Sequence, residues 1–123
     1  MKKLIIFLFS IFISINSYCG VFNETICFET DGQNIVFLPN EANPYTGKYL
    51  CKYENGQKES EGRYKNGKLD GKRTVWHENG QIESEMNYKN GKLDGKLIEW
   101  FQFNGEIKRE QSYKNGKLCI NEC

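Results

Sequence analysis

One segment of the chain, residues 45–118, repeats a single pattern three times. The stretch 47–56 aligns with 71–80 and with 95–105, where one residue is inserted. Each copy then ends in the residue types Tyr-Lys-Asn-Gly-Lys-Leu, at 64–69, 88–93 and 113–118. The period is therefore 24 residues, and 25 across the insertion. A fixed period of this length is typical of an array of small structural units that stack on one another.

Asn-Gly pairs punctuate the array and set its secondary structure. They stand at 55–56, 66–67, 79–80, 90–91, 104–105 and 115–116. Because both residues tolerate positive φ, this pair favours a two-residue type I′ hairpin turn, and we predict such turns here. Strands of roughly 6–9 residues fit between successive turns. Helices are not expected, since each window is short and ends in Gly. The array is predicted to be all-β, an elongated antiparallel β-meander of three 24-residue hairpin repeats.

The supply of apolar residues favours one sheet over two. The repeats hold ten Ile, Leu, Val or Met residues and ten aromatic residues. That number is too small to cover both sheets of a sandwich. Within one sheet, the aligned positions should stack as ladders, Leu50 with Thr74 and Ile98, and Tyr64 with Tyr88 and Tyr113. We expect bends at Asp70-Gly71 and Asp94-Gly95, where glycine accepts unusual backbone angles.

The repeated runs resemble a known family. The runs at 64–72 and 88–96, with the Glu-Asn-Gly turns, are similar to the MORN repeat (membrane occupation and recognition nexus) in its bacterial variant, common in proteins labelled as antitoxins. This resemblance covers about 45–118. It implies a structural or interaction repeat, and some members are linked to phospholipid binding or scaffolding. The first copy differs, with Lys52 and Lys58 at positions that hold Trp or Ile in the other copies, which indicates an end repeat.

The N-terminus has the pattern of a secretory signal peptide, residues 1–19. A basic start precedes an apolar run, Leu4 to Ile15, and then a polar exit. That run is too short to span a membrane as a helix. Cleavage fits before Gly20 or after Ser17, and lipidation of Cys19 is a further alternative. We expect a secreted, periplasmic or cell-envelope protein.

Residues 20–44 are predicted to form an N-terminal cap hairpin over the first repeat. Apolar stretches around Cys27 and at 34–38 flank Asp31-Gly32, and Pro39 and Pro44 prevent continuation. Terminal repeats need such a cover. The segment carries four acids and no base, whereas 45–118 carries 15 bases against 11 acids, so the two segments have opposite charge.

Four cysteines remain after the signal region, and an even number in an exported chain indicates disulfides. Six strand steps of about 4.8 Å separate Cys51 from Cys119, well beyond the reach of a disulfide. We therefore favour Cys27–Cys51 at the cap and Cys119–Cys123 in the tail at 119–123. A zinc site and reduced thiols are the alternatives.

Residues with catalytic potential are few, and we expect no enzyme activity, cofactor or metal. His77 is the only imidazole and aligns with Tyr53 and Phe101, so it is interpreted as filling an aromatic slot on a strand. Acid pairs such as Glu83 and Glu85 indicate solvated faces and cross-strand ion pairs. The net charge of +1 also argues against a nucleic-acid partner.

Aromatic residues and repeated lysines are the candidates for partner binding. The candidates are Trp76, Trp100, Phe101, Phe103, Lys72 and Lys96. The prediction is an exported, non-enzymatic module that binds an unidentified protein through one sheet face. The alternatives are attachment to a membrane surface or cell envelope, as a lipoprotein or through lysine rows, and a toxin-neutralising role like that of an antitoxin.

Overall fold

The computed structural model describes residue 27, residues 35–121 and residue 123. The predicted signal peptide lies outside these residues, as does most of the first strand of the predicted cap hairpin. The described part contains strands and no helix. The strands are β1, Gly47–Lys52; β2, Lys58–Lys65; β3, Lys68–Leu69; β4, Gly71–Trp76; β5, Ile82–Lys89; β6, Lys92–Trp100; β7, Ile107–Lys114; and β8, Lys117–Leu118.

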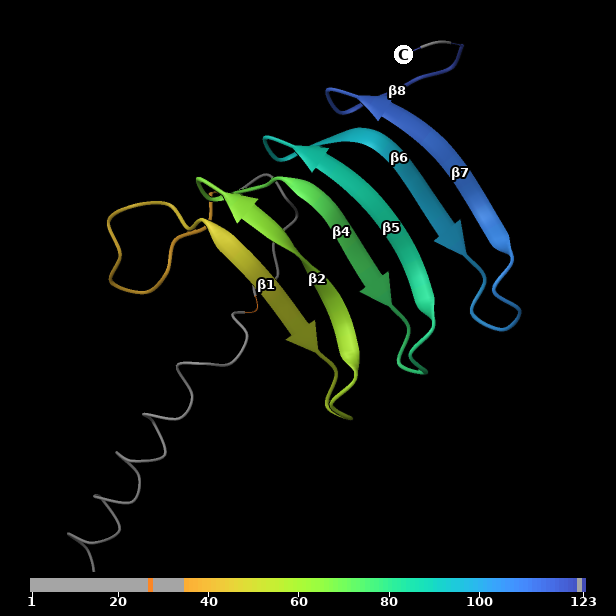
Figure 1. The fold of residues 1–123 in the computed structure, drawn as a ribbon, viewed down its shortest axis with the longest axis horizontal. Coiled ribbons are helices and arrows are strands. Elements are labelled where there is room, and N and C mark those ends of the chain that lie inside the picture. The colour runs from red at the N-terminus through yellow and green to blue at the C-terminus, as the bar shows by residue number, and fades with distance from the viewer. Residues whose placement is uncertain (1–26, 28–34, 122) are drawn as a thin grey trace, which may run out of the picture.

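All strands belong to one antiparallel sheet in the order β1-β2-β4-β5-β6-β7-β8, with the short β3 paired to β2. Figure 1 shows the long strands side by side in chain order, joined by loops at one end and tight turns at the other. The sequence prediction of an all-β, single-sheet meander is confirmed. The long strands contain 6, 8 or 9 residues, as the spacing of the turns predicts.

The Asn-Gly pairs adopt two conformations. At 66–67, 90–91 and 115–116 both residues have positive φ, for example 51° at Asn66 and 77° at Gly67, which confirms type I′ turns. The prediction is wrong at 55–56, 79–80 and 104–105, where only the glycine has positive φ. There the Gly56 amide donates to Tyr53 O and the Tyr53 amide to Gln57 O, which makes a three-residue loop.

The asparagine side chain closes each of these longer loops. Asn55 Oδ1 accepts a hydrogen bond from the amide of Gln57, two residues on, at 2.9 Å. Asn79 and Asn104 make the same bond to the second residue after them. Such a local bond mimics a backbone turn. Asparagine therefore serves the two turn types in different ways, through backbone freedom in one and through its side chain in the other.

Bends occur at both predicted Asp-Gly positions. Gly71 and Gly95 have φ of 95° and 115°, in the region that favours glycine. Between the pairs Tyr88–Leu93 and Met86–Leu97, β6 advances two residues more than β5. Extra residues in one strand bend it and increase its twist. These bends therefore curve the sheet next to the type I′ turns, as Figure 1 shows.

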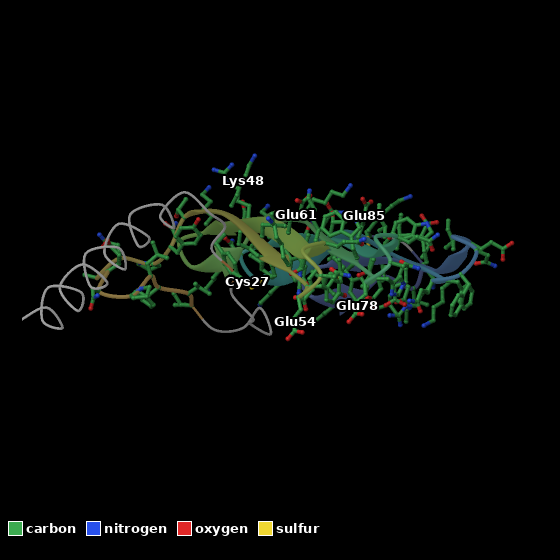
Figure 2. All side chains as sticks on the ribbon, turned by 90° about the horizontal axis from the view of Figure 1, so that it is seen from below. Cys27, Lys48, Glu54, Glu61, Glu78 and Glu85 are labelled. Atoms are coloured by element: carbon green, nitrogen blue, oxygen red, sulfur yellow. A yellow bond between two sulfur atoms is a disulfide. The ribbon has the colours of Figure 1, made fainter. Side chains whose placement is uncertain are left out.

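The two faces of the sheet differ in chemistry. The side of Tyr49, Cys51 and Tyr64 is called the core face here, and the opposite side is called the ionic face. A continuous row of cross-strand partners crosses the ionic face: Leu50, Glu61, Thr74, Glu85, Ile98 and Glu110. The predicted ladder of Leu50, Thr74 and Ile98 is thus present, with a glutamate between its members. In Figure 2, Glu61 and Glu85 project from one side and Cys27 lies on the other.

The main buried cluster lies at the N-terminal end of the core face. Its buried residues are Val36, Tyr49, Cys51, Tyr64 and Leu69. Val36 comes from the predicted cap and donates its amide to Gly67 O at 2.8 Å. The predicted strand at 34–38 is reduced in the described residues to one bridge, Phe37 with Pro44, because the flanking prolines limit the ladder.

Backbone hydrogen bonds tie each type I′ turn to the chain before it. The amides of Gly67, Gly91 and Gly116 donate to the carbonyls of Tyr45, Leu69 and Leu93, at 2.7 to 2.8 Å. These acceptors are spaced 24 residues apart, so the bond repeats with the sequence period. This recurrence gives the Asn-Gly turn a second role, since its glycine amide locks successive repeats together.

Both favoured disulfides are present. Cys27–Cys51 has Cα atoms 4.8 Å apart, and Cys119–Cys123 has them 5.6 Å apart. The first joins the predicted cap to β1, and the second closes a short loop after β8. Within the described part of the chain, nothing forms a helix long and apolar enough to cross a membrane.

Candidate binding cleft

The three longer loops lie at one end of the sheet (Figure 1). Tyr53 begins the first loop, and its hydroxyl donates to the carbonyl of Trp76, 23 residues on, at 2.6 Å. Asn55 Nδ2 donates to Glu78 O at 3.2 Å, a second link between the same two loops. The first and second loops are thus joined by one phenol and one amide.

Carboxylates surround this phenol. Burial, and then the charges of Glu59, Glu83 and Glu78, raise the pKa of Tyr53 above its usual value. The hydroxyl is therefore protonated at neutral pH and available as a donor. Glu59 and Glu83 are equivalent positions in successive repeats, so Tyr53 sits between two copies of the same acidic position.

His77 occupies the equivalent position between the second and third loops, 24 residues after Tyr53. An imidazole is shorter than a phenol and has no hydroxyl to reach the next carbonyl, that of Trp100. His77 Nε2 is buried and has no hydrogen-bond partner among the described residues. Tyr53 therefore joins the first and second loops, whereas His77 leaves a gap between the second and third loops.

That gap is a cleft of about 270 Å³. We call it the loop cleft. Its lining residues are His77, Glu83, Glu99, Trp100, Phe101, Gln102, Phe103 and Lys108. Two positions next to Tyr53 hold Glu59 and Glu83. One repeat later, the equivalent positions next to His77 hold Glu83 and Lys108. The loop cleft is therefore the equivalent, one repeat along, of the space that Tyr53 fills.

The inserted residue of the third repeat shapes the outer wall of the loop cleft. The Phe101 amide donates to Glu106 O, so this loop is one residue longer than the other two. Phe103 is 91% exposed and Phe101 is 49% exposed. Large apolar side chains with this much contact to water, grouped beside a hollow, are typical of an interaction site.

Charged groups of both signs line the loop cleft. His77 Nδ1 lies 3.6 Å from Glu83 Oε2, within ion-pair range but too long for a hydrogen bond. Arg109 donates to Glu99, which ties that carboxylate to β7. Lys108 Nζ lies 6.0 Å from the centre of the Phe101 ring, at the outer limit of a cation–π contact. Glu83 is thus the acid of the cleft without a lysine or arginine partner among the described residues.

The structure brings together three of the six predicted partner-binding residues. Trp100, Phe101 and Phe103 line the loop cleft, at the loop end of the sheet rather than in the middle of a face. Trp76 lies outside it, and Lys58 Nζ stands over the Trp76 ring at 5.1 Å. The position that distinguishes the first repeat, Lys58, therefore covers the tryptophan of the second.

The two predicted lysines lie elsewhere, on the ionic face. Lys72 pairs with Glu85 at 2.6 Å and Lys96 with Glu110 at 2.8 Å. These pairs confirm the expected cross-strand ion pairs. They also leave little free positive charge at Lys72 and Lys96 for an acidic surface.

Sequence reasoning gave His77 and Glu83 no role in binding. The sequence feature that pointed to this site is the replacement of tyrosine by histidine at an aligned position. Histidine is smaller and lacks the hydroxyl, and this difference opens the cleft. Among the described residues, no group of three or more His, Cys, Asp or Glu side chains is arranged to hold a metal ion.

The comparisons with known proteins agree with the internal period. A family model described as MORN repeat variant matches residues 45–66, 69–90 and 93–115, more than half of the chain. No curated protein and no solved structure matches the chain.

Proposed function

Because the chain belongs to the MORN repeat variant family, we propose that it is an exported, non-enzymatic binding module whose loop cleft and exposed phenylalanines engage a protein partner. The observation that carries the proposal is the exposure of Phe103 and Phe101 beside a hollow lined by Trp100. Burial of aromatic anchors in or around a pocket dominates the energy of many protein interfaces.

The local design of the third repeat supports this assignment. The first two longer loops are tied together, whereas the third is separated from the second by the loop cleft and carries the additional residue. A phenylalanine that serves only the fold would be covered, since burying it stabilises the protein by about 1.5–3 kcal/mol. Phe103 makes almost no such contribution at 91% exposure.

Export is supported by the N-terminal sequence pattern and by the two disulfides, which persist in oxidising compartments. Intact mass of the protein recovered from its source cells tests this part. We expect loss of residues 1–19, or of 1–17 if cleavage follows Ser17, and four oxidised cysteines in the remaining chain. A mass that corresponds to the whole chain with free thiols would contradict export.

The binding proposal is tested with purified full chain immobilised and exposed to extract of the source cells. Phe103→Ser removes the exposed ring and few contacts within the fold. Ile120→Ser is the matched control, because Ile120 is 85% exposed but follows β8 and does not line the loop cleft. We expect at least one protein to be retained by the wild type and the control and lost by Phe103→Ser, with direct binding of that purified protein as confirmation. Identical retention by all three would overturn the proposal.

A further inference from the structure

We propose that the loop cleft is a socket for a phenolic side chain, a tyrosine presented by the binding partner, whose hydroxyl donates to the carbonyl of Trp100. This inference rests on the proposed function, since it names the group that the partner inserts. The protein's own first repeat supports it, because Tyr53 fills the equivalent space there.

The comparison between the two spaces is direct. Tyr53 reaches from the first loop to Trp76 O at 2.6 Å, and the spacing from Tyr53 to Trp76 equals that from His77 to Trp100. Trp76 and Trp100 also hold equivalent places in the ladder, opposite Ile82 and Ile107. Among the described residues, no side chain donates to Trp100 O. The acceptor is therefore kept in the third repeat and the donor is lost.

Size and polarity agree with this occupant. A volume of about 270 Å³ lies just below the range of pockets for drug-sized ligands, about 300–1,000 Å³, and suits a single large side chain. A ring that enters would contact Trp100 and Phe101, and aromatic pairs of this kind are favourable beyond their buried area. The unpartnered Nε2 of His77 adds a second polar atom within the lining.

Charge separates a phenol from the alternatives. Lys108 replaces the acid found at the equivalent place near Tyr53, so these two aligned positions hold one acid and one base in the cleft, whereas they hold two acids in the first repeat. A lysine or arginine side chain would meet Lys108 as a like charge. A phenylalanine has no hydroxyl and would make no hydrogen bond to the carbonyl, which lowers its affinity relative to tyrosine.

The experiment titrates the full chain with N-acetyl-tyrosine amide, N-acetyl-phenylalanine amide and N-acetyl-lysine amide, followed by backbone NMR shifts. We expect the tyrosine probe to move the amides of residues 100–103 and to bind about three- to tenfold more tightly than the phenylalanine probe, the value of one hydrogen bond. Equal binding of both aromatic probes, preference for the lysine probe, or no shift at these residues would overturn the inference.

His77→Tyr supplies the missing phenol within the chain and is the sharpest variant. We expect it to raise Tm and to lose binding of the tyrosine probe at least tenfold. Glu59→Gln is the control, because Glu59 is the repeat equivalent of Glu83 and does not line the cleft. Unchanged probe binding in a folded His77→Tyr protein would contradict the inference. Should His77→Tyr not fold, the probe comparison on the wild type still decides.

The outcomes distinguish this inference from the broader proposal. If retention of the partner depends on Phe103 but the tyrosine probe does not bind, only the phenol socket is refuted. If the tyrosine probe binds but no retained protein depends on Phe103, the proposed mode of partner binding is refuted and the phenol socket is still supported.

Discussion

At the residue scale, one dipeptide meets two different backbone demands in this protein. Asn90 has φ of 51° and lies in a type I′ turn, whereas Asn79 has no positive φ and uses its side chain to bind the amide of Gln81 at 3.0 Å. Glycine satisfies the first demand because it adopts positive φ without strain. It cannot satisfy the second, since it has no side-chain oxygen.

Substitution of each asparagine by glycine should therefore separate the two turn types. We expect Asn90→Gly to change the free energy of unfolding by less than about 0.5 kcal/mol. Asn79→Gly should cost about 1–2 kcal/mol, from the lost hydrogen bond and the added backbone entropy. Urea unfolding followed by circular dichroism measures both. Equal losses would mean that the side-chain bond contributes nothing.

Asn79 and Asn90 also show which features of the fold the sequence could predict and which it could not. Period, strand length, sheet order and both disulfides followed from residue spacing, because hairpin turns fix the positions of strands. The turn type did not follow, since identical Asn-Gly pairs differ only in the strand register imposed by their neighbours. The loop cleft was missed for a similar reason. His77 was aligned with Tyr53, but its consequence appears only where Tyr53 Oη is seen to bond Trp76 O.

At the scale of the elements, successive turns are held together across the sheet. Asp94, in the bend of β6, accepts a hydrogen bond from the Asn115 amide at 3.1 Å and lies 3.4 Å from Lys114 Nζ. Thr46 Oγ1 accepts the Asn66 amide in the same way at the other end of the array. Thr46 and Asp94 hold equivalent places in their repeats, and each is thus connected to the type I′ turn that follows it.

Acid should weaken the link at Asp94. The amide of Asn115, followed by the charge and hydrogen bond of Lys114, lowers the pKa of Asp94 below its usual value. A lowered folded pKa means that the carboxylate stabilises the fold above about pH 4 and that this contribution is lost as pH falls through the folded value. Asp94→Asn should therefore be less stable than wild type at neutral pH, and the difference should shrink near about pH 2.

Urea midpoints at the two pH values measure this difference. Asp70→Asn is the matched control, since Asp70 is the equivalent residue one repeat earlier and makes no side-chain hydrogen bond among the described residues. A difference between wild type and Asp94→Asn that persists unchanged in acid would contradict the role of the carboxylate.

At the scale of the whole molecule, the two disulfides should contribute unequally. Cys27–Cys51 spans 24 residues and joins residue 27 to the buried strand β1, whereas Cys119–Cys123 spans 4 residues in the tail. Loop-closure entropy assigns about 3.5 kcal/mol to the first and about 2 kcal/mol to the second. We expect the double alanine variant of Cys27 and Cys51 to lose more stability in urea than that of Cys119 and Cys123. The reverse order would contradict this ranking of the two disulfides.

The array is also unevenly packed from end to end. The aligned tyrosines of the core face show this, since Tyr64 is 2% exposed and covered by Val36 and Leu69, whereas the later tyrosines are only half-buried. Leu69 is buried, while Leu118, at the same place in the last repeat, is 45% exposed. In a repeat array, each unit is stabilised mainly by its neighbours, so the last unit, in which only the two-residue β8 pairs with the outer edge of β7, has the weakest support.

Native-state hydrogen exchange should therefore show a gradient along the sheet. Amides of β2 and β4 should exchange slowest, with an opening free energy close to that of global unfolding, and amides of β7 should open at lower cost. Loss of the Cys27–Cys51 bond should reduce protection of β2 more than that of β7, because Cys51 belongs to the same buried cluster as Tyr64 of β2. Uniform protection from β2 to β7 would show that the sheet opens as one unit and that the half-buried tyrosines hold the last repeat as firmly as Tyr64 holds the first.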